Sequence, residues 1–196
     1  MKKFVMMAVC AVTLMSSSAF AKQDTKDFKI ENTGNQQLEN KLNKEIESKN
    51  INETNEEQKK SISTTFEEKY HDDKKLSFVI TRTETQASTG IQKLYYNVNL
   101  ETGEDLTLKD LLGDNYKELV NKSVQSQIEQ RMKEDENQIF FGFTQDEKDM
   151  GIKGFESIKD DQTFYINKDG NVVITFEQFE IAPGYMGIPE FEIIKK

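Results

Sequence analysis

The sequence is poor in the residues on which most enzymes and most disulfide-stabilised exported domains depend. Cys10 and His71 are its single cysteine and its single histidine, tryptophan is absent, and only two prolines occur. One cysteine cannot form a disulfide within the chain, and a Ser-His-Asp triad would have to be built around His71. No Walker loop, GxGxxG or GxSxG motif is present. An enzyme of this sequence would therefore have to work through carboxylates.

Long hydrophobic runs are also scarce, and the one clear run lies at the start of the chain. Lys2 and Lys3 precede FVMMAVCAVTLM, and SSSAFA then supplies small residues in an A-x-A cleavage pattern. This arrangement predicts a cleaved signal peptide at 1–21, with the mature chain beginning at Lys22 and Cys10 removed. The protein is expected to be exported to the periplasm or the extracellular space. No membrane span is expected in the mature chain.

Positive charge is in deficit. The chain carries 26 Lys and Arg against 35 Asp and Glu, a net charge of −9, which becomes −11 once Lys2 and Lys3 leave with the signal peptide. Phosphates would be repelled, so nucleic acids and anionic membrane surfaces are not expected as partners. The excess of acids favours a cationic partner, or simply serves solubility.

Helical patterns dominate the first part of the predicted mature chain. Leu38, Leu42 and Ile46 recur every four residues and predict a helix from about residue 35. A set at 62, 66 and 70 repeats that spacing and predicts a second helix. The polar stretch NINETNEEQKK between them is either an exposed helical face or a break between two helices.

The rest of the chain alternates between strand and helix signals. An antiparallel hairpin is predicted over 76–100, and a short helix capped by Thr107 follows it. An apolar stripe from Tyr116 to Met132 predicts a long helix, and KDGN between two β-rich runs predicts a second hairpin. The final PEFEIIKK predicts a last strand. The predicted fold is α+β: an antiparallel sheet with hairpins packed against two or three helices. Residues 22–91 are predicted to form a helical and strand region, and 92–196 an α+β region that packs with it as one unit.

Three polar clusters invite a catalytic or metal-binding interpretation. HDD begins at His71, NKDGN resembles part of a calcium loop but lacks the distal glutamate, and acids occur in pairs such as Glu177 with Glu180. In so acidic a chain, adjacent acids are more typical of turns and solvated faces. We therefore predict no catalytic residue, no metal site and no cofactor.

The C-terminal segment is the most informative. TFYINKDGNVVITFEQFEIAPGYMGIPEFEI resembles the signature of a family of bacterial extracytoplasmic domains, found in the lysozyme-sensing anti-sigma factor of sigma-V and as the accessory region of a peptidoglycan deacetylase. NVNLETGEDLTLKDLLGD resembles the family's middle segment, and the resemblance covers roughly 92–193. It does not extend to the deacetylase's catalytic domain and implies no deacetylase activity.

By this resemblance, the chain is expected to be a secreted or envelope-associated, non-catalytic binding module that recognises lysozyme or a cell-wall glycan. The two alternatives are a carboxylate-based hydrolase of envelope polysaccharide and a structural envelope protein. The candidate binding loop contains Phe179, Glu180, Pro183, Gly184, Tyr185, Met186 and Gly187. Proline fixes φ and glycine permits turns, so the segment is predicted to be a structured loop between two strands. Its Tyr and Met side chains either plug the core, the favoured interpretation, or form exposed contacts.

Overall fold

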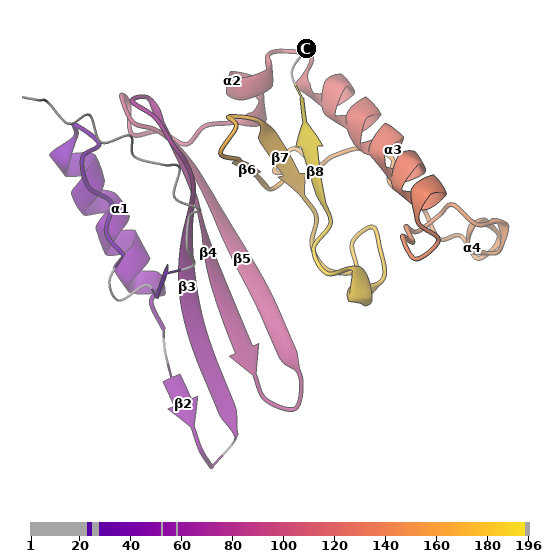
Figure 1. The fold of residues 1–196 in the computed structure, drawn as a ribbon, viewed down its shortest axis with the longest axis horizontal. Coiled ribbons are helices and arrows are strands. Elements are labelled where there is room, and N and C mark those ends of the chain that lie inside the picture. The colour runs from indigo at the N-terminus through magenta and orange to yellow at the C-terminus, as the bar shows by residue number, and fades with distance from the viewer. Residues whose placement is uncertain (1–22, 25–27, 52, 58, 195–196) are drawn as a thin grey trace, which may run out of the picture.

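The computed structural model describes residues 23–24, 28–51, 53–57 and 59–194, so the predicted signal peptide lies outside the described residues. Figure 1 shows two halves side by side, each an antiparallel sheet with a helix packed on it. The α+β class is therefore confirmed, with two sheets where one was expected. Among the described residues we find no helix with the length and apolar character needed to span a bilayer.

The N-terminal half is built on a five-stranded sheet. Its strands are β1 (Gln23–Asp24), β2 (Glu53–Asn55), β3 (Lys60–His71), β4 (Lys75–Thr85) and β5 (Thr89–Asn99). The order is β1-β3-β4-β5, with β2 also paired to β3. The predicted hairpin over 76–100 is confirmed as β4 and β5, in register from Thr85 opposite Thr89. The strand β5 forms one edge of the sheet.

One helix, α1 (Gln36–Lys49), covers one face of this sheet, as its apolar stripe predicted. The Asn35 side chain accepts a hydrogen bond from the Leu38 N–H and so satisfies a donor of the first turn. The stripe at 38, 42 and 46 is buried against Phe66 and Phe78 of the sheet. Burial of this kind, rather than helix propensity, holds such a helix in place.

The prediction of a helix around residues 62–70 is wrong, because this segment belongs to the strand β3. A spacing of four residues returns to the same face in a strand as well as in a helix, so Ile62 and Phe66 fit both structures. The run SISTTF between them is rich in β-branched residues, which favour strands. A bulge between Glu68 and Tyr70 then shifts the register with β4.

The C-terminal half combines four helical segments with a three-stranded sheet. These are α2 (Leu108–Leu112), α3 (Tyr116–Glu134), α4 (Gln145–Asp149), η1 (Gly184–Met186), β6 (Phe164–Ile166), β7 (Val172–Thr175) and β8 (Glu190–Ile193). The sheet order is β6-β7-β8. The predicted Thr107 cap, long helix, KDGN hairpin and last strand are all confirmed.

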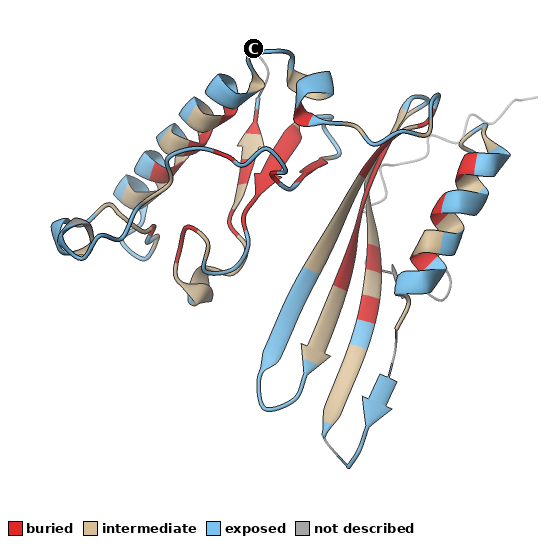
Figure 2. Cartoon of the chain, turned by 180° about the vertical axis from the view of Figure 1, so that it is seen from behind, coloured by how far each residue is buried: buried red, intermediate tan, exposed pale blue. Residues whose placement is uncertain are grey.

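Each half has its own hydrophobic core. In the C-terminal half, Val120, Val124 and Ile128 of α3 pack against Ile174 and Phe191 of the sheet. Figure 2 shows buried residues on α1, on α3 and along the strands of both sheets, whereas the far end of the β4–β5 hairpin is exposed. That exposed end therefore contributes to a surface rather than to a core.

Buried hydrogen bonds join the two halves where β4 and β5 meet β6. The Asn97 amide donates to the Phe164 carbonyl (2.9 Å), the Ser77 hydroxyl donates to Asn97 Oδ1 (2.7 Å), and the Ile166 N–H donates to Ser77 Oγ (3.0 Å). These contacts link the two halves. The division at residues 91 and 92 stays a prediction, and β5 runs across it.

Candidate functional site

The predicted binding loop, residues 179–187, lies between β7 and β8 and is fixed to the C-terminal core at its base. Ile181 and Ala182 are buried in that core. The Ile181 carbonyl also accepts a hydrogen bond from the Phe141 N–H (2.9 Å), which ties the loop to the segment after α3. The loop is therefore anchored at its start before it turns outward.

A short 3₁₀ turn, η1, shapes the tip of the loop. The Met186 N–H donates to the Pro183 carbonyl (2.9 Å), and the Gly187 N–H donates to the Gly184 carbonyl (3.1 Å). Gly187 has φ of 69°, a conformation that glycine adopts without strain. The Gln178 side-chain amide donates to the Gly184 carbonyl (2.7 Å) and pins the turn from outside. The expectation of a structured loop is thus met by hydrogen bonds at each turn.

Two aromatic side chains of this loop face solvent. Phe179 is 66% exposed and Tyr185 is 67% exposed. Phe179 has φ of 70°, which is uncommon for a bulky residue, and costs of about 1–3 kcal/mol are typical of such conformations. Its ring lies over Gly184, where a Cβ would come within 2.2 Å of the Phe179 ring. Strained, exposed aromatic residues of this kind often mark functional sites.

The other predicted site residues have supporting positions. Met186 is half-buried against the C-terminal core, so the inward packing favoured from sequence is right for Met186 and wrong for Tyr185. Glu180 accepts from the Glu177 N–H (2.8 Å) and forms an ion pair with Lys159 (2.6 Å). Its hydrogen bond raises the pKa of the Lys159 ammonium. Glu180 and Met186 therefore hold the loop rather than form its exposed tip.

A cleft of about 510 Å³ lies beside the loop, between the edge of β5 and residues 175–178. Ile91, near the exposed end of β5, is 55% exposed and lines it. Deeper in the cleft, the Tyr95 hydroxyl is buried and has no hydrogen-bond partner among the described residues. Burial raises the pKa of Tyr95 to about 12, and the nearby Thr175 side chain lowers this pKa by a smaller amount. The loop, the cleft and the β5 edge thus form one continuous surface.

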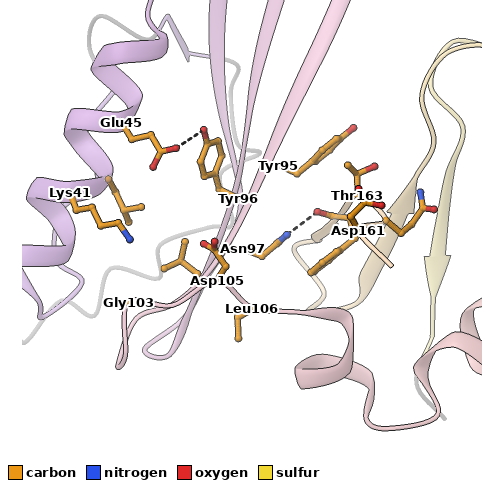
Figure 3. Close-up of a pocket in the computed structure, with 14 residues that line it drawn as sticks. Lys41, Glu45, Tyr95, Tyr96, Asn97, Gly103, Asp105, Leu106, Asp161 and Thr163 are labelled. Carbon is orange, nitrogen blue, oxygen red and sulfur yellow. Dashed lines mark hydrogen bonds between the residues drawn. The ribbon is translucent and has the colours of Figure 1, made fainter. Parts of the chain in front are cut away.

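A second hollow, of about 330 Å³, lies where α1, β5 and β6 meet (Figure 3). Tyr96 points toward α1 and donates to Glu45 Oε1 (3.1 Å), whereas Tyr95 points to the opposite side of β5. The Asn97 amide is bonded to Phe164. Because Tyr96 binds Glu45 and Asn97 binds the Phe164 carbonyl across this hollow, we interpret it as a joint between the halves rather than as an open site.

The acidic clusters show no sign of catalytic tuning. Where surroundings shift the pKa of a described carboxyl, the shift is downward, as for Glu192, whose pKa is lowered by hydrogen bonds from Asn171 and Asn167. A general acid needs a raised pKa, so these groups give the hydrolase alternative no support. No group of three or more potential metal ligands occurs among the residues that the structure describes.

Sequence reasoning missed the residues that surround the loop. Gln178 binds the loop, Arg131 of α3 shares a cavity wall with it, and the edge of β5 faces the adjoining residues 175–178 across the cleft. Neither Arg131 nor the edge of β5 carries a local pattern that would have indicated the contact, because their proximity arises only from the packing of distant segments. Only Gln178, next to the predicted loop, was within reach of a sequence argument.

Comparison with known proteins supports the resemblance for the C-terminal part. Residues 105–196 match the family described as a protein of unknown function, DUF3298. The anti-sigma-V factor RsiV of Bacillus subtilis (strain 168) is 40% identical over 110 residues, which cover 56% of this chain and 37% of RsiV. The resemblance to the anti-sigma-V factor is therefore confirmed, although the chain spans little more than a third of that protein.

Solved structures resemble the fold. A member of the DUF3298 family from Bacteroides fragilis aligns with a TM-score of 0.51 at 17% identity, over 80% of this chain and 60% of that one. A DUF3298 protein from Pseudomonas aeruginosa aligns over 67% of this chain and 58% of its own, at 15% identity and a TM-score of 0.46. The first of these supports the fold alone, and the second is too distant to carry a comparison.

Proposed function

We propose that this chain, whose residues 105–196 match the DUF3298 family and which is similar to RsiV, is a non-catalytic binding module that acts outside the cytoplasmic membrane. Its partner is a basic protein, and lysozyme is the candidate that the sequence resemblance implies. The 179–187 loop is the centre of the contact. The observation that carries this proposal is the pair of exposed aromatic side chains, Phe179 and Tyr185, on a loop whose backbone is fixed.

A fixed loop favours recognition for a thermodynamic reason. Flexible loops lose conformational entropy when they bind, and the turn at 183–187 is already ordered by its own hydrogen bonds. Tyrosine and phenylalanine are enriched in the cores of protein interfaces, where a few aromatic residues supply most of the affinity. The exposure of Phe179 and Tyr185 is inconsistent with a role in the hydrophobic core of this protein.

The charge of the chain favours a basic protein as the partner. The full sequence carries a net charge of −9, and the exposed Glu177 lies two residues before Phe179. A negative surface accelerates the encounter with a cationic protein, and this steering weakens as salt screens it. The charge argument is independent of the resemblance and points in the same direction.

Glycan recognition receives less support from the structure. It would require several exposed aromatic side chains along one groove, but Tyr95 packs near Tyr165, Tyr96 stacks on Phe78, and Phe140 is buried in the core. Among the described residues, the aromatic side chains that are exposed are Phe179 and Tyr185, and these share one loop tip. That arrangement suits an anchor in a protein interface better than a sugar-binding platform.

Calorimetric titration of residues 22–196 with a c-type lysozyme, at low and at high salt, tests the proposal. We expect saturable binding that weakens as salt rises, and no retention of the protein on insoluble peptidoglycan. Absence of binding at low salt would refute the lysozyme assignment. Salt-independent retention on peptidoglycan would favour a glycan ligand instead.

A further inference from the structure

Arg131, near the C-terminal end of α3, carries a positive charge that the described part of the chain leaves without a counter-ion. Arg82 and Arg131 are the two arginines of the sequence. Arg82 lies 3.7 Å from a carboxylate oxygen of Glu84, whereas no described carboxylate lies within ion-pair distance of Arg131. In a chain with an excess of acids, an arginine without a carboxylate partner is unexpected.

The Arg131 guanidinium is held in a defined position. Nη2 donates to the Glu190 carbonyl (2.8 Å), and the guanidinium carbon lies 4.4 Å from the centre of the Phe191 ring. Half-burial lowers the pKa of the guanidinium, although arginine remains charged at neutral pH. The Glu190 carboxylate does not neutralise it, because that carboxylate binds Lys93 (3.1 Å) and the Tyr165 hydroxyl (2.9 Å).

This guanidinium borders a cavity of about 540 Å³ directly behind the 179–187 loop. Tyr185, Met186 and Ile188 form the side of the cavity that belongs to the loop region. The Tyr185 hydroxyl reaches the Asn137 carbonyl at 3.4 Å across it. One fixed cation therefore faces a space whose rim includes the exposed aromatic tip of the loop.

We propose that Arg131 binds a carboxylate side chain of the protein partner that the loop recognises, an inference that rests on the proposed function. A guanidinium has five N–H donors, and the hydrogen bond from Arg131 Nη2 to the Glu190 carbonyl leaves a fork that matches a carboxylate in shape and charge. A half-buried charge without a counter-ion is unfavourable, and a partner carboxylate compensates it. The acidic surface attracts the basic partner, and Arg131 fixes its orientation.

Attraction by the acidic surface and orientation by Arg131 predict opposite effects on binding when a positive charge is removed. Against a basic partner, removal of any positive charge should leave binding unchanged or strengthen it. Lys133, exposed two residues further along α3 and absent from the cavity wall, provides the matched control. We expect Lys133→Gln to bind lysozyme as well as the parent protein or better. Arg131→Gln should bind ~10-fold more weakly or worse, because it removes a charge-assisted pair at an interface.

Thermal unfolding of both variants checks that the fold persists, and Arg131→Lys, which keeps the charge but loses the fork, should bind with intermediate affinity. Equal affinities of the Gln variants at 131 and 133 would overturn the proposal while leaving the proposed function intact. Failure of the parent protein to bind lysozyme would instead refute the lysozyme assignment made in the proposed function.

A second measurement tests the carboxylate site without the partner. The two arginines give two Nε–H signals in a nitrogen–proton correlation spectrum, and Arg131→Gln identifies which is which. Sodium acetate, compared with sodium chloride at equal ionic strength, should shift the Arg131 signal in a saturable way and leave the Arg82 signal in place. Identical responses of the two signals to acetate would overturn the proposal even if lysozyme binds.

Discussion

Replacement of Ser77 by alanine should lower the free energy of unfolding, because this one hydroxyl forms hydrogen bonds with two buried groups at the junction of the two halves. Ser77 is fully buried, and Asn97 is 7% exposed. The Ser77 hydroxyl donates to Asn97 Oδ1 at 2.7 Å and accepts from the Ile166 N–H at 3.0 Å. Alanine leaves both of these groups buried without that partner.

The expected magnitude follows from the number of groups left unpaired. A buried donor or acceptor without a partner costs about 1–3 kcal/mol, so two such groups predict a loss of about 2–6 kcal/mol in the free energy of unfolding. That is a large share of the 5–15 kcal/mol typical of a small domain. Ser88→Ala, at an exposed position in the β4–β5 turn, is the matched control and should change stability by less than about 0.5 kcal/mol.

Urea unfolding followed by circular dichroism measures both effects. The double variant Ser77→Ala with Asn97→Ala should cost less than the sum of the single changes, because the two side chains belong to one network. A Ser77→Ala variant as stable as the Ser88→Ala control would refute the reasoning. It would mean that water replaces the hydroxyl and that the junction is not closed to solvent.

Three further outcomes are expected. Burial raises the pKa of Tyr95 and of Tyr96 to about 12, so the stability that their neutral forms contribute is complete below pH 10 and is lost as pH rises from 10 through 12. Alkaline unfolding monitored at 295 nm, where tyrosinate absorbs, should show this loss. A free energy of unfolding that stays unchanged up to pH 12 would contradict it. Tyr95→Phe should leave stability unchanged or raise it by up to about 1 kcal/mol, since its buried hydroxyl has no hydrogen-bond partner within the part of the chain that the structure describes; a clear loss of stability in urea unfolding would contradict this. Ile128→Ala, fully buried between α3 and the second sheet, should cost about 2–5 kcal/mol in the same assay, and a loss under 1 kcal/mol would contradict the packing described.

The elements that local sequence predicts well are those with one consistent signal. The 38, 42 and 46 stripe, the Thr107 cap and the KDGN turn each predict one structure, and the protein contains it. At 62, 66 and 70 the apolar spacing fits a helix and a strand equally, and β-branched neighbours with long-range pairing to β4 decide for the strand. Periodicity alone could not have resolved that choice.

The candidate site divides in the same way. The prolines and glycines of the 179–187 loop predict its turns, because their backbone preferences are local properties. The exposure of Tyr185 and the burial of Met186 depend on what packs against each, and the sequence does not contain that information. The proximity of Arg131 to the loop arises from the packing of α3 against β8, which only the folded chain brings together.

The central claim is that the 179–187 loop recognises a basic protein through its two exposed aromatic side chains. The most direct test is calorimetric titration of a c-type lysozyme with the Phe179→Ser, Tyr185→Ser double variant and with Met150→Ser, which changes an exposed apolar residue outside the loop. We expect the parent protein and Met150→Ser to bind alike, and the double variant to bind at least ~10-fold more weakly with an unchanged unfolding temperature. Equal binding by all three proteins would contradict it.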